Sequence, residues 1–313
     1  MHTLTIAIPT YNRDKILSEN IGVLEKIVAL NLAIDVKILV VDNGSSETSI
    51  PKNKYFEYKK NKFNIGLNGS LLRIIEYVDS DYLWILGDDD YLDEVLITDL
   101  IDVIINNNPD WLILSQSDTT LEKKEYDTVD KLLDSGIDFQ DLIFISTNIY
   151  RTDLLKNNMA YVYNENNKHM PHFLSITESN KINKIIRFGY NPFKKIGMEK
   201  DLANRWPPIM LWTGSIFDYI YNNNSNVSYK SRLNFLKNIR KNWLTNKNLM
   251  WSMYLIKDQK NKSKYMIYKK ISSYIGIIDG PLVGICTRFI LLMSILMPNF
   301  LKYLAVKINK INR

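Results

Sequence analysis

The chain has 313 residues, 46% of them hydrophobic, which is enough for about two domains with packed cores. A single cysteine, Cys286, excludes a disulfide framework and suits a reducing cytosol. The formal charge of +6 favours anionic partners such as nucleotides or phospholipids. A strand pattern begins already at Leu4, which predicts a chain without a signal peptide.

The first part of the chain alternates strand and helix patterns. Short aliphatic runs bounded by Pro, Asp or Gly predict strands at residues 4–8, 36–41, 82–86 and 111–115. Apolar residues recurring every three or four positions predict helices at residues 14–30, 66–78 and 92–105. The second of these helices is expected to bury Leu67 and Leu71 on one face. This order predicts an α/β fold with a mainly parallel, doubly wound sheet.

The remaining part is less regular. Residues 142–145 and 182–188 are predicted as further strands. A domain boundary is expected at residue 206, followed by a basic, helical C-terminal region over 207–313. The helices expected there are 209–223, 232–256, 263–279 and 281–304.

The last of these helices is strongly apolar. Its uncharged stretch between Arg288 and Lys302 has 13 residues, fewer than the roughly 20 that span a bilayer. A short apolar helix with basic neighbours is typical of burial at a membrane surface. Packing of the helix on the protein's own core is the alternative.

Three carboxylates, Asp88, Asp89 and Asp90, follow the strand at residues 82–86 and the intervening Gly87. Ligands in α/β sheets bind just beyond the carboxyl ends of the strands. Adjacent acids repel one another unless a cation neutralises them, and Mg²⁺ takes such oxygen ligands and usually bridges to phosphates. The run therefore predicts a metal-dependent site for a phosphorylated substrate, with a solvated acidic turn as the alternative.

Three other segments are expected at the same edge of the sheet. Asp42 ends the second strand, where a carboxylate can accept a hydrogen bond from a nucleobase or a ribose. The segment Pro9–Arg13 offers backbone donors, an aromatic ring and a guanidinium group for phosphate. Asn64, Gly66 and Asn68 stand at a helix start, where backbone N–H groups point outward. Each is weak alone, but together they predict one ligand site.

These motifs resemble those of the family-2 glycosyltransferases, which have the nucleotide-sugar-dependent GT-A fold. The resemblance covers roughly residues 3–115 and lies in Ile8–Arg13, Val41–Ser46, Asn64–Gly66 and Leu86–Asp90. A looser resemblance, to the abequosyltransferase-like subgroup that builds lipopolysaccharide O-antigens and related surface glycans, lies in Trp84–Asp90, Phe144–Ile149 and Met170–His172.

The resemblance implies a donor site. The nucleotide, with a UDP-sugar favoured, would lie along Pro9–Arg13, and Mg²⁺ or Mn²⁺ would bridge its diphosphate to the acidic run. The usual family motif is Asp-x-Asp-Asp, so Gly87 replaces its first acid and the metal pair is Asp89 with Asp90. The other register pairs Asp88 with Asp90. The expected nucleotide-sugar-binding residues are Pro9, Thr10, Tyr11, Arg13, Asp42, Asn64, Gly66, Asn68, Asp88 and Asp89.

The resemblance also implies transfer with inversion, which needs a base for the acceptor hydroxyl. Family members usually carry a Glu-Asp pair where this chain has Met170–His172. His172 is the candidate base because histidine titrates near neutral pH. A structural histidine, or an additional metal or phosphate contact, is the alternative. The rival residues are His169, Glu199 and Asp201.

Other classes fit less well. A nucleotidyltransferase would carry a Gly-rich loop in place of Pro9–Arg13, and a dinucleotide-dependent oxidoreductase would show G-x-G-x-x-G. The basic C-terminal region carries no nucleic-acid-binding motif.

The expected protein is therefore a cytoplasmic glycosyltransferase, peripheral on the inner face of the cell membrane. It would move a sugar to a lipid-linked saccharide in bacterial surface polysaccharide synthesis, such as that of O-antigen, capsule or lipooligosaccharide. The alternative is a degenerate relative serving as an assembly or glycan-binding subunit.

Overall fold

The structure is a computed structural model. It describes residues 2–30, 32–46, 48–115, 120–164, 170–195 and 225–242, together with 272, 275, 277–280, 284–289 and 292. The chain divides into two compact units, Met1–Lys200 and Asp201–Arg313. The boundary expected at residue 206 lies outside the described residues.

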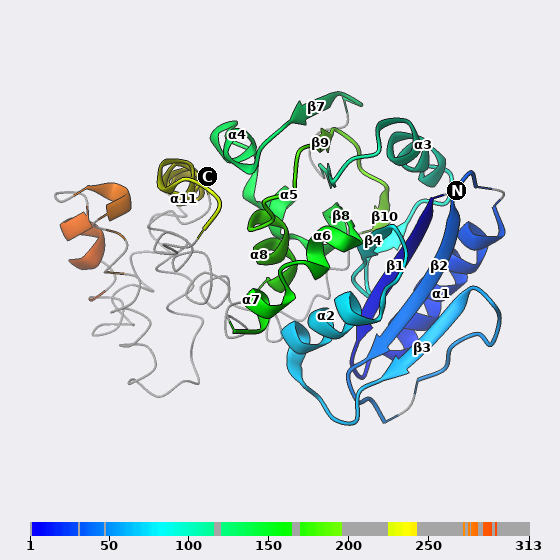
Figure 1. Cartoon of the computed structure of the whole chain (residues 1–313). Coiled ribbons are helices and arrows are strands. Elements are labelled where there is room, and N and C mark those ends of the chain that lie inside the picture. The colour runs from blue at the N-terminus through cyan, green and yellow to red at the C-terminus, as the bar shows by residue number, and fades with distance from the viewer. Residues whose placement is uncertain are drawn as a thin grey trace, which may run out of the picture. The chain divides into compact units, whose positions relative to one another are not determined.

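The first unit is built on an eight-stranded sheet with the order β3-β2-β1-β4-β8-β6-β9-β7 (Figure 1). Its first four strands are parallel, and β8 lies antiparallel between β4 and β6. β9 runs parallel to β6, and β7 is antiparallel at the edge. The strands are β1 (Thr3–Thr10), β2 (Asp35–Asp42), β3 (Phe56–Lys60), β4 (Tyr82–Ile85), β6 (Trp111–Leu114), β7 (Lys123–Tyr126), β8 (Asn148–Arg151) and β9 (Ile185–Phe188). The expected mainly parallel sheet is confirmed.

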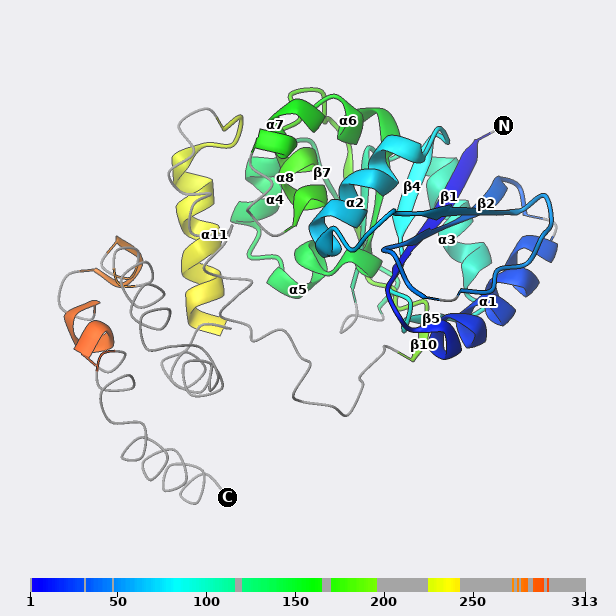
Figure 2. The same cartoon turned by 90° about the horizontal axis from the view of Figure 1, so that it is seen from below.

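Helices cover both faces of this sheet (Figures 1 and 2). Alternate residues of β1, such as Leu4 and Ile6, pack with α1 (Asp14–Ala29) and α3 (Ile97–Asn107) in one buried core. The opposite face of β1 and β2 contacts α2 (Gly66–Tyr77). A sheet whose strands bury side chains on both faces needs helices on both faces, as in this doubly wound arrangement.

The remaining helices of this unit are short and follow β7 and β8. They are α4 (Val129–Asp134), α5 (Phe139–Ile143), α6 (Thr152–Lys156), α7 (Met159–Asn164) and α8 (Pro171–Thr177), with a 3₁₀ turn, η1, at Ile145–Thr147.

The strand expected at residues 142–145 is wrong. Residues 142 and 143 end α5, and residue 145 begins η1. The Asp138 side chain caps α5 by accepting from Gln140 N–H, and Asn148 Nδ2 donates to the carbonyl groups of Asp141 and Phe144. Such side-chain hydrogen bonds favour turns and helix ends over the hydrogen-bond ladder of a strand. In so short an apolar run, periodicity alone cannot distinguish a strand from a helix.

Two other expectations need correction. The helix expected from residue 92 begins at Ile97, because β5 (Tyr91–Leu92) pairs antiparallel with β10 (Phe193–Lys195). Leu67, expected on the buried face of α2, is 40% exposed, whereas Leu71 is buried. Leu67 stands in the first turn of α2, whereas the buried residues of this helix begin at Ser70.

The second unit contains α11 (Tyr229–Asn242), which buries Phe235, Leu236 and Ile239. Arg240 on this helix makes a two-pronged ion pair with Asp279 at 2.9–3.1 Å. α11 begins before the expected residue 232, and the other expected helices lie wholly or largely outside the described residues. Within the described part of the chain, no helix is long and apolar enough to cross a membrane.

Candidate functional site

The carboxyl ends of β1, β2 and β4 meet at one edge of the sheet. Thr10, the last residue of β1, is in register with Asp42, the last residue of β2. Leu86 N–H donates to the carbonyl of Ala7, so the segment that follows β4 also lies beside β1. The strand-end residues predicted from the sequence are therefore brought together where α/β sheets bind ligands.

Asp88 is buried and paired with two residues from the end of β1. Thr10 Oγ1 donates to its Oδ2 at 2.9 Å, and Arg13 Nη1 donates to its Oδ1 at 2.8 Å. Burial raises the pKa of Asp88 above its usual value, against the opposing effect of the Arg13 charge and hydrogen bond. Arg13 Nη1 also lies 3.4 Å from Asp89 Oδ2.

The three aspartates differ in exposure. The Asp89 side chain is 25% exposed, while Asp88 and Asp90 are buried. Ser146 Oγ in η1 donates to Asp90 Oδ2 at 2.5 Å and accepts a hydrogen bond from Gly87 N–H at 2.9 Å. Asp89 is thus the carboxylate of the run that is most open to a ligand.

Asp42 is enclosed by hydrogen-bond donors. Ser45 N–H donates to Oδ1 at 2.8 Å, and Thr48 Oγ1 and the Tyr58 hydroxyl donate to Oδ2 at 2.9 and 2.6 Å. Burial acts to raise the pKa of Asp42, but the hydrogen bonds from Ser45, Tyr58 and Thr48 outweigh it and the pKa lies below its usual value. Burial and the bond to Asp42 together raise the pKa of Tyr58 to about 12. Asp42 is therefore ionised at neutral pH.

The turn after β2 is joined to the start of α2. Asn64 Oδ1 accepts from Asn43 Nδ2 at 2.7 Å and from Gly66 N–H at 2.8 Å. Gly66 has φ +76°, a conformation that residues with a Cβ rarely adopt. Asn68, also predicted for the site, lies in the first turn of α2 and is half-buried.

The segment after β1 is held by the turn after β2. Asn12 N–H donates to Ser45 Oγ at 2.8 Å, and Asn12 itself has φ +53°. Pro9 is buried within the strand end, whereas the Tyr11 ring is 43% exposed. An exposed ring on this segment suits stacking on a planar base.

His172 lies apart from these residues. It stands on α8, is 1% exposed, and its Nε2 lies 3.2 Å from the carbonyl oxygen of Ile143. Burial lowers its pKa to about 4, so the imidazole is neutral at pH 7. The rivals His169, Glu199 and Asp201 lie outside the described residues. The base role of His172 stays a prediction.

Sequence reasoning missed several residues that shape the site. Asn20 Nδ2 on α1 lies 3.1–3.4 Å from the carbonyl oxygens of Gly87, Asp88 and Asp90. An amide on the apolar face of a helix was a detectable signal. Ser146 fell within the resemblance segment Phe144–Ile149, but nothing local indicated its bond to Asp90, 56 residues away. Thr48 and Tyr58 carried no recognisable pattern.

The donor set suits a hard divalent cation. The described residues contain no group of three or more His, Cys, Asp or Glu side chains arranged around a common metal position. Mg²⁺ needs no such cage, since it is usually held by one or two carboxylates and the substrate phosphates. Asp89 and Asp90 carry carboxylate oxygens of that kind.

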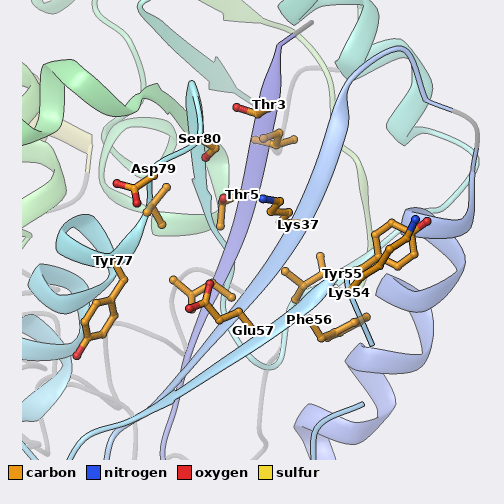
Figure 3. A pocket seen from close by; sticks show the side chains of 14 residues that line it. Thr3, Thr5, Lys37, Lys54, Tyr55, Phe56, Glu57, Tyr77, Asp79 and Ser80 are labelled. Atoms are coloured by element: carbon orange, nitrogen blue, oxygen red, sulfur yellow. The ribbon is translucent and has the colours of Figure 1, made fainter. Parts of the chain in front are cut away.

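A separate cavity of about 320 Å³ lies at the opposite, amino-terminal edge of the sheet (Figure 3). Thr3, Lys37, Phe56 and Asp79 line it, near the starts of β1, β2, β3 and β4. It contains none of the predicted site residues.

Comparison with known proteins points to one family. Residues 5–170, more than half of the chain, match the sequence profile of glycosyl transferase family 2. The chain is also 31% identical over 97 residues to abequosyltransferase RfbV of Salmonella typhimurium. That match covers 28% of this chain and 28% of the relative.

Solved structures share the fold. Staphylococcus aureus TarS (residues 1–349), solved in complex with UDP-GlcNAc, superposes with a TM-score of 0.62 at 16% identity, covering 93% of this chain and 87% of that one. Mannosyltransferase PcManGT of Pyrobaculum calidifontis, in complex with GDP-Man and Mn²⁺, gives 0.51 at 9% identity, covering 95% and 87%. At these identities the likeness concerns the fold, which is the GT-A fold expected from the sequence.

Proposed function

Because the chain belongs to glycosyl transferase family 2, we propose that it transfers a sugar from a nucleotide diphosphate donor to a saccharide acceptor in bacterial surface polysaccharide synthesis. The observation that carries the proposal is the meeting of Arg13, Asp42 and the aspartate run at one edge of the sheet. The resemblance to an abequosyltransferase supports O-antigen, capsule or lipooligosaccharide as the product class.

The nucleotide lies along Pro9–Arg13 in this proposal, with its base at Asp42. Ser45, Thr48 and Tyr58 orient the Asp42 carboxylate and keep it ionised. An ionised carboxylate accepts only from donors, so a base with an imide N–H, such as uracil, suits it. UDP-GlcNAc in the TarS structure also supports a UDP-sugar as the favoured donor.

The proposed cofactor is Mg²⁺ or Mn²⁺, held by Asp89 and Asp90. When bound, the ion would neutralise charge on the diphosphate leaving group. Asp88 is the weaker ligand candidate, because Arg13 and Thr10 already occupy its two oxygens. Mn²⁺ in the mannosyltransferase structure supports the choice of metal.

Inversion needs a base, and His172 remains the candidate. Its imidazole is neutral at pH 7 and so can accept a proton, but a pKa of about 4 makes it a weaker base than an ordinary histidine. His172 is buried at the start of α8, so an acceptor hydroxyl reaches it only if that helix moves.

A lipid-linked acceptor and an inner-face, peripheral location on the cell membrane complete the proposal. In the second unit, α11 exposes Lys230, Lys237 and Lys241, and Ile285 and Phe289 are about 60% exposed one helical turn apart. Exposed apolar side chains together with basic ones suit an anionic lipid surface.

A non-catalytic assembly or glycan-binding subunit is the second candidate. Met170 and Pro171 stand where family members usually carry an acid pair, and the neighbouring His172 is buried.

The test is calorimetric titration of UDP, GDP, CDP and dTDP with and without Mn²⁺. The proteins compared are the wild type, the double variant Asp89→Ala with Asp90→Ala, and Asp79→Ala. The last is the control, because Asp79 is a carboxylate at the amino-terminal edge of the sheet. We expect metal-dependent binding of UDP that the double variant loses and the control keeps. Absence of metal-dependent binding of any nucleotide to the wild type would overturn the proposed donor site.

A further inference from the structure

Ser146 lies at the centre of the contacts that shape the aspartate loop. It is fully buried in η1, between α5 and β8. Its carbonyl oxygen accepts from Trp84 Nε1 at 2.8 Å, which ties η1 to β4. Its hydroxyl lies between Gly87 and Asp90, at the two ends of the loop. One residue therefore contacts both the strand and the loop that follows it.

Its two neighbours determine where the Ser146 hydroxyl proton points. Because Oγ accepts from Gly87 N–H at 2.9 Å, its single proton is left to point at Asp90 Oδ2, 2.5 Å away. If this hydroxyl turned away from Asp90, one of its two hydrogen bonds would be lost. The contact therefore fixes which Asp90 oxygen faces the interior.

Gly87 leaves the space for this arrangement. A Cβ at residue 87 would stand 2.6 Å from Asp90 Oδ2 and 3.2 Å from Asp90 Cγ. Any other residue would therefore push the Asp90 carboxylate away from Ser146. The position of Asp90 thus requires a glycine at residue 87, where the usual family motif has its first acid.

Arg13, which contacts Asp88, and Ser146, which contacts Asp90, differ in charge. Asp88 contacts the Arg13 guanidinium, which compensates its negative charge. Ser146 is neutral, so its bond orients Asp90 without compensating the charge that attracts a cation. Asp90 also belongs to both possible registers of the metal pair.

We propose that Ser146 is a positioning residue for the divalent cation: by holding Asp90 Oδ2 it fixes the direction in which the carboxylate would be presented to the metal. The inference rests on the proposed function. Outer-shell partners of this kind orient metal ligands, and losing one typically weakens metal affinity roughly 10–100-fold.

The experiment measures Mn²⁺ affinity in the presence of UDP, and UDP affinity in EDTA, for the full-length wild type and three variants. Ser146→Ala removes the hydroxyl. Gly87→Ala displaces the same Asp90 oxygen independently, and so tests the proposal even where Ser146→Ala fails to fold. Thr147→Ala is the control, because this buried hydroxyl in the same turn donates to the carbonyls of Asp141 and Phe144 and not to Asp90.

We expect Mn²⁺ to bind roughly 10–100-fold more weakly to Ser146→Ala and Gly87→Ala, with UDP affinity in EDTA unchanged. Thr147→Ala should keep the wild-type Mn²⁺ affinity. Wild-type Mn²⁺ affinity in a folded Ser146→Ala or in Gly87→Ala would overturn the positioning role and leave the proposed function standing. A wild type without metal-dependent UDP binding would overturn both.

Discussion

The carboxyl edge of β1, β2 and β4 differs from the region around β8 and α8 in how its polar groups are paired. At the edge, Asp42, Asp88 and Asp90 each accept hydrogen bonds from side chains of neighbouring elements. Around β8 and α8, the Tyr150 hydroxyl, Thr152 Oγ1 and His172 Nδ1 are buried and find no hydrogen-bond partner among the described residues.

The difference shows where the molecule is prepared for a ligand. A paired carboxylate keeps its charge and direction before a ligand arrives, so little reorganisation is needed on binding. An unpaired buried polar group costs about 1–3 kcal/mol and leaves its surroundings sensitive to conditions. The carboxylates at the edge are therefore better prepared for a ligand than the polar groups around His172. The changes below test this contrast, from the largest expected effect to the smallest.

His172 should make the α8 region sensitive to mild acid. Its pKa is about 4 in the folded protein and about 6.5 when unfolded, so only the unfolded state takes up a proton between these values. The free energy of unfolding should therefore fall as pH drops from 6.5 to 4, by about 3 kcal/mol in all. His172→Gln should remove this slope in denaturant titrations across that range.

The same variant decides the catalytic role of His172. A general base contributes roughly 10²–10⁴-fold, so transfer should collapse at unchanged nucleotide affinity if His172 is the base. Transfer retained by the folded variant would contradict that role. A pH slope that survives the substitution would contradict the assigned cause of acid sensitivity.

Asp42→Ala should weaken metal-free UDP binding by about 2 kcal/mol, or roughly 30-fold, because a hydrogen bond to a charged group is lost. Calorimetry in EDTA measures it. Asp35→Ala, at the exposed start of the same strand, is the control and should bind as the wild type does. Equal binding by both variants would remove Asp42 from the nucleotide site.

The lowered pKa of Asp42 predicts a loss of stability at lower pH than the loss caused by His172. Its pKa is lowered on folding, so its stabilising effect is present at pH values above the unfolded value and is lost only as pH falls below about 4. Unfolding of Asp42→Asn, compared with wild type, should show a stability difference that is constant from pH 7 to 5 and shrinks below 4. A difference that changes between pH 7 and 5 would contradict this.

Tyr58→Phe should have the smallest effect. It removes one of the hydrogen bonds to Asp42, which should raise the pKa of that carboxyl and weaken UDP binding by about 1 kcal/mol, or roughly fivefold. Tyr55→Phe is the matched control, because Tyr55 lines the cavity at the amino-terminal edge. Similar losses in both variants would show that losing a tyrosine hydroxyl weakens binding wherever it lies, and would contradict a specific effect of the bond to Asp42.

Much of the edge could be predicted because its signals are local. Aliphatic runs ending in Asp42 and Gly87 marked two strand ends, and parallel strands bring such ends to one edge. The start of α2 at Gly66 was confirmed for the same reason, since its positive φ favours glycine. The order of short strands and helices likewise indicated the α/β fold.

The sequence by itself determined the parallel half-sheet, its helices and the acidic loop, because period and turn chemistry act between near neighbours. Only the tertiary structure decided that residues 142–145 form a helix end and a turn, that Leu67 is exposed and that His172 is enclosed. It alone paired Ser146 with Asp90, 56 residues away. Burial and long-range hydrogen bonds depend on which distant segments pack together, and no local pattern records that.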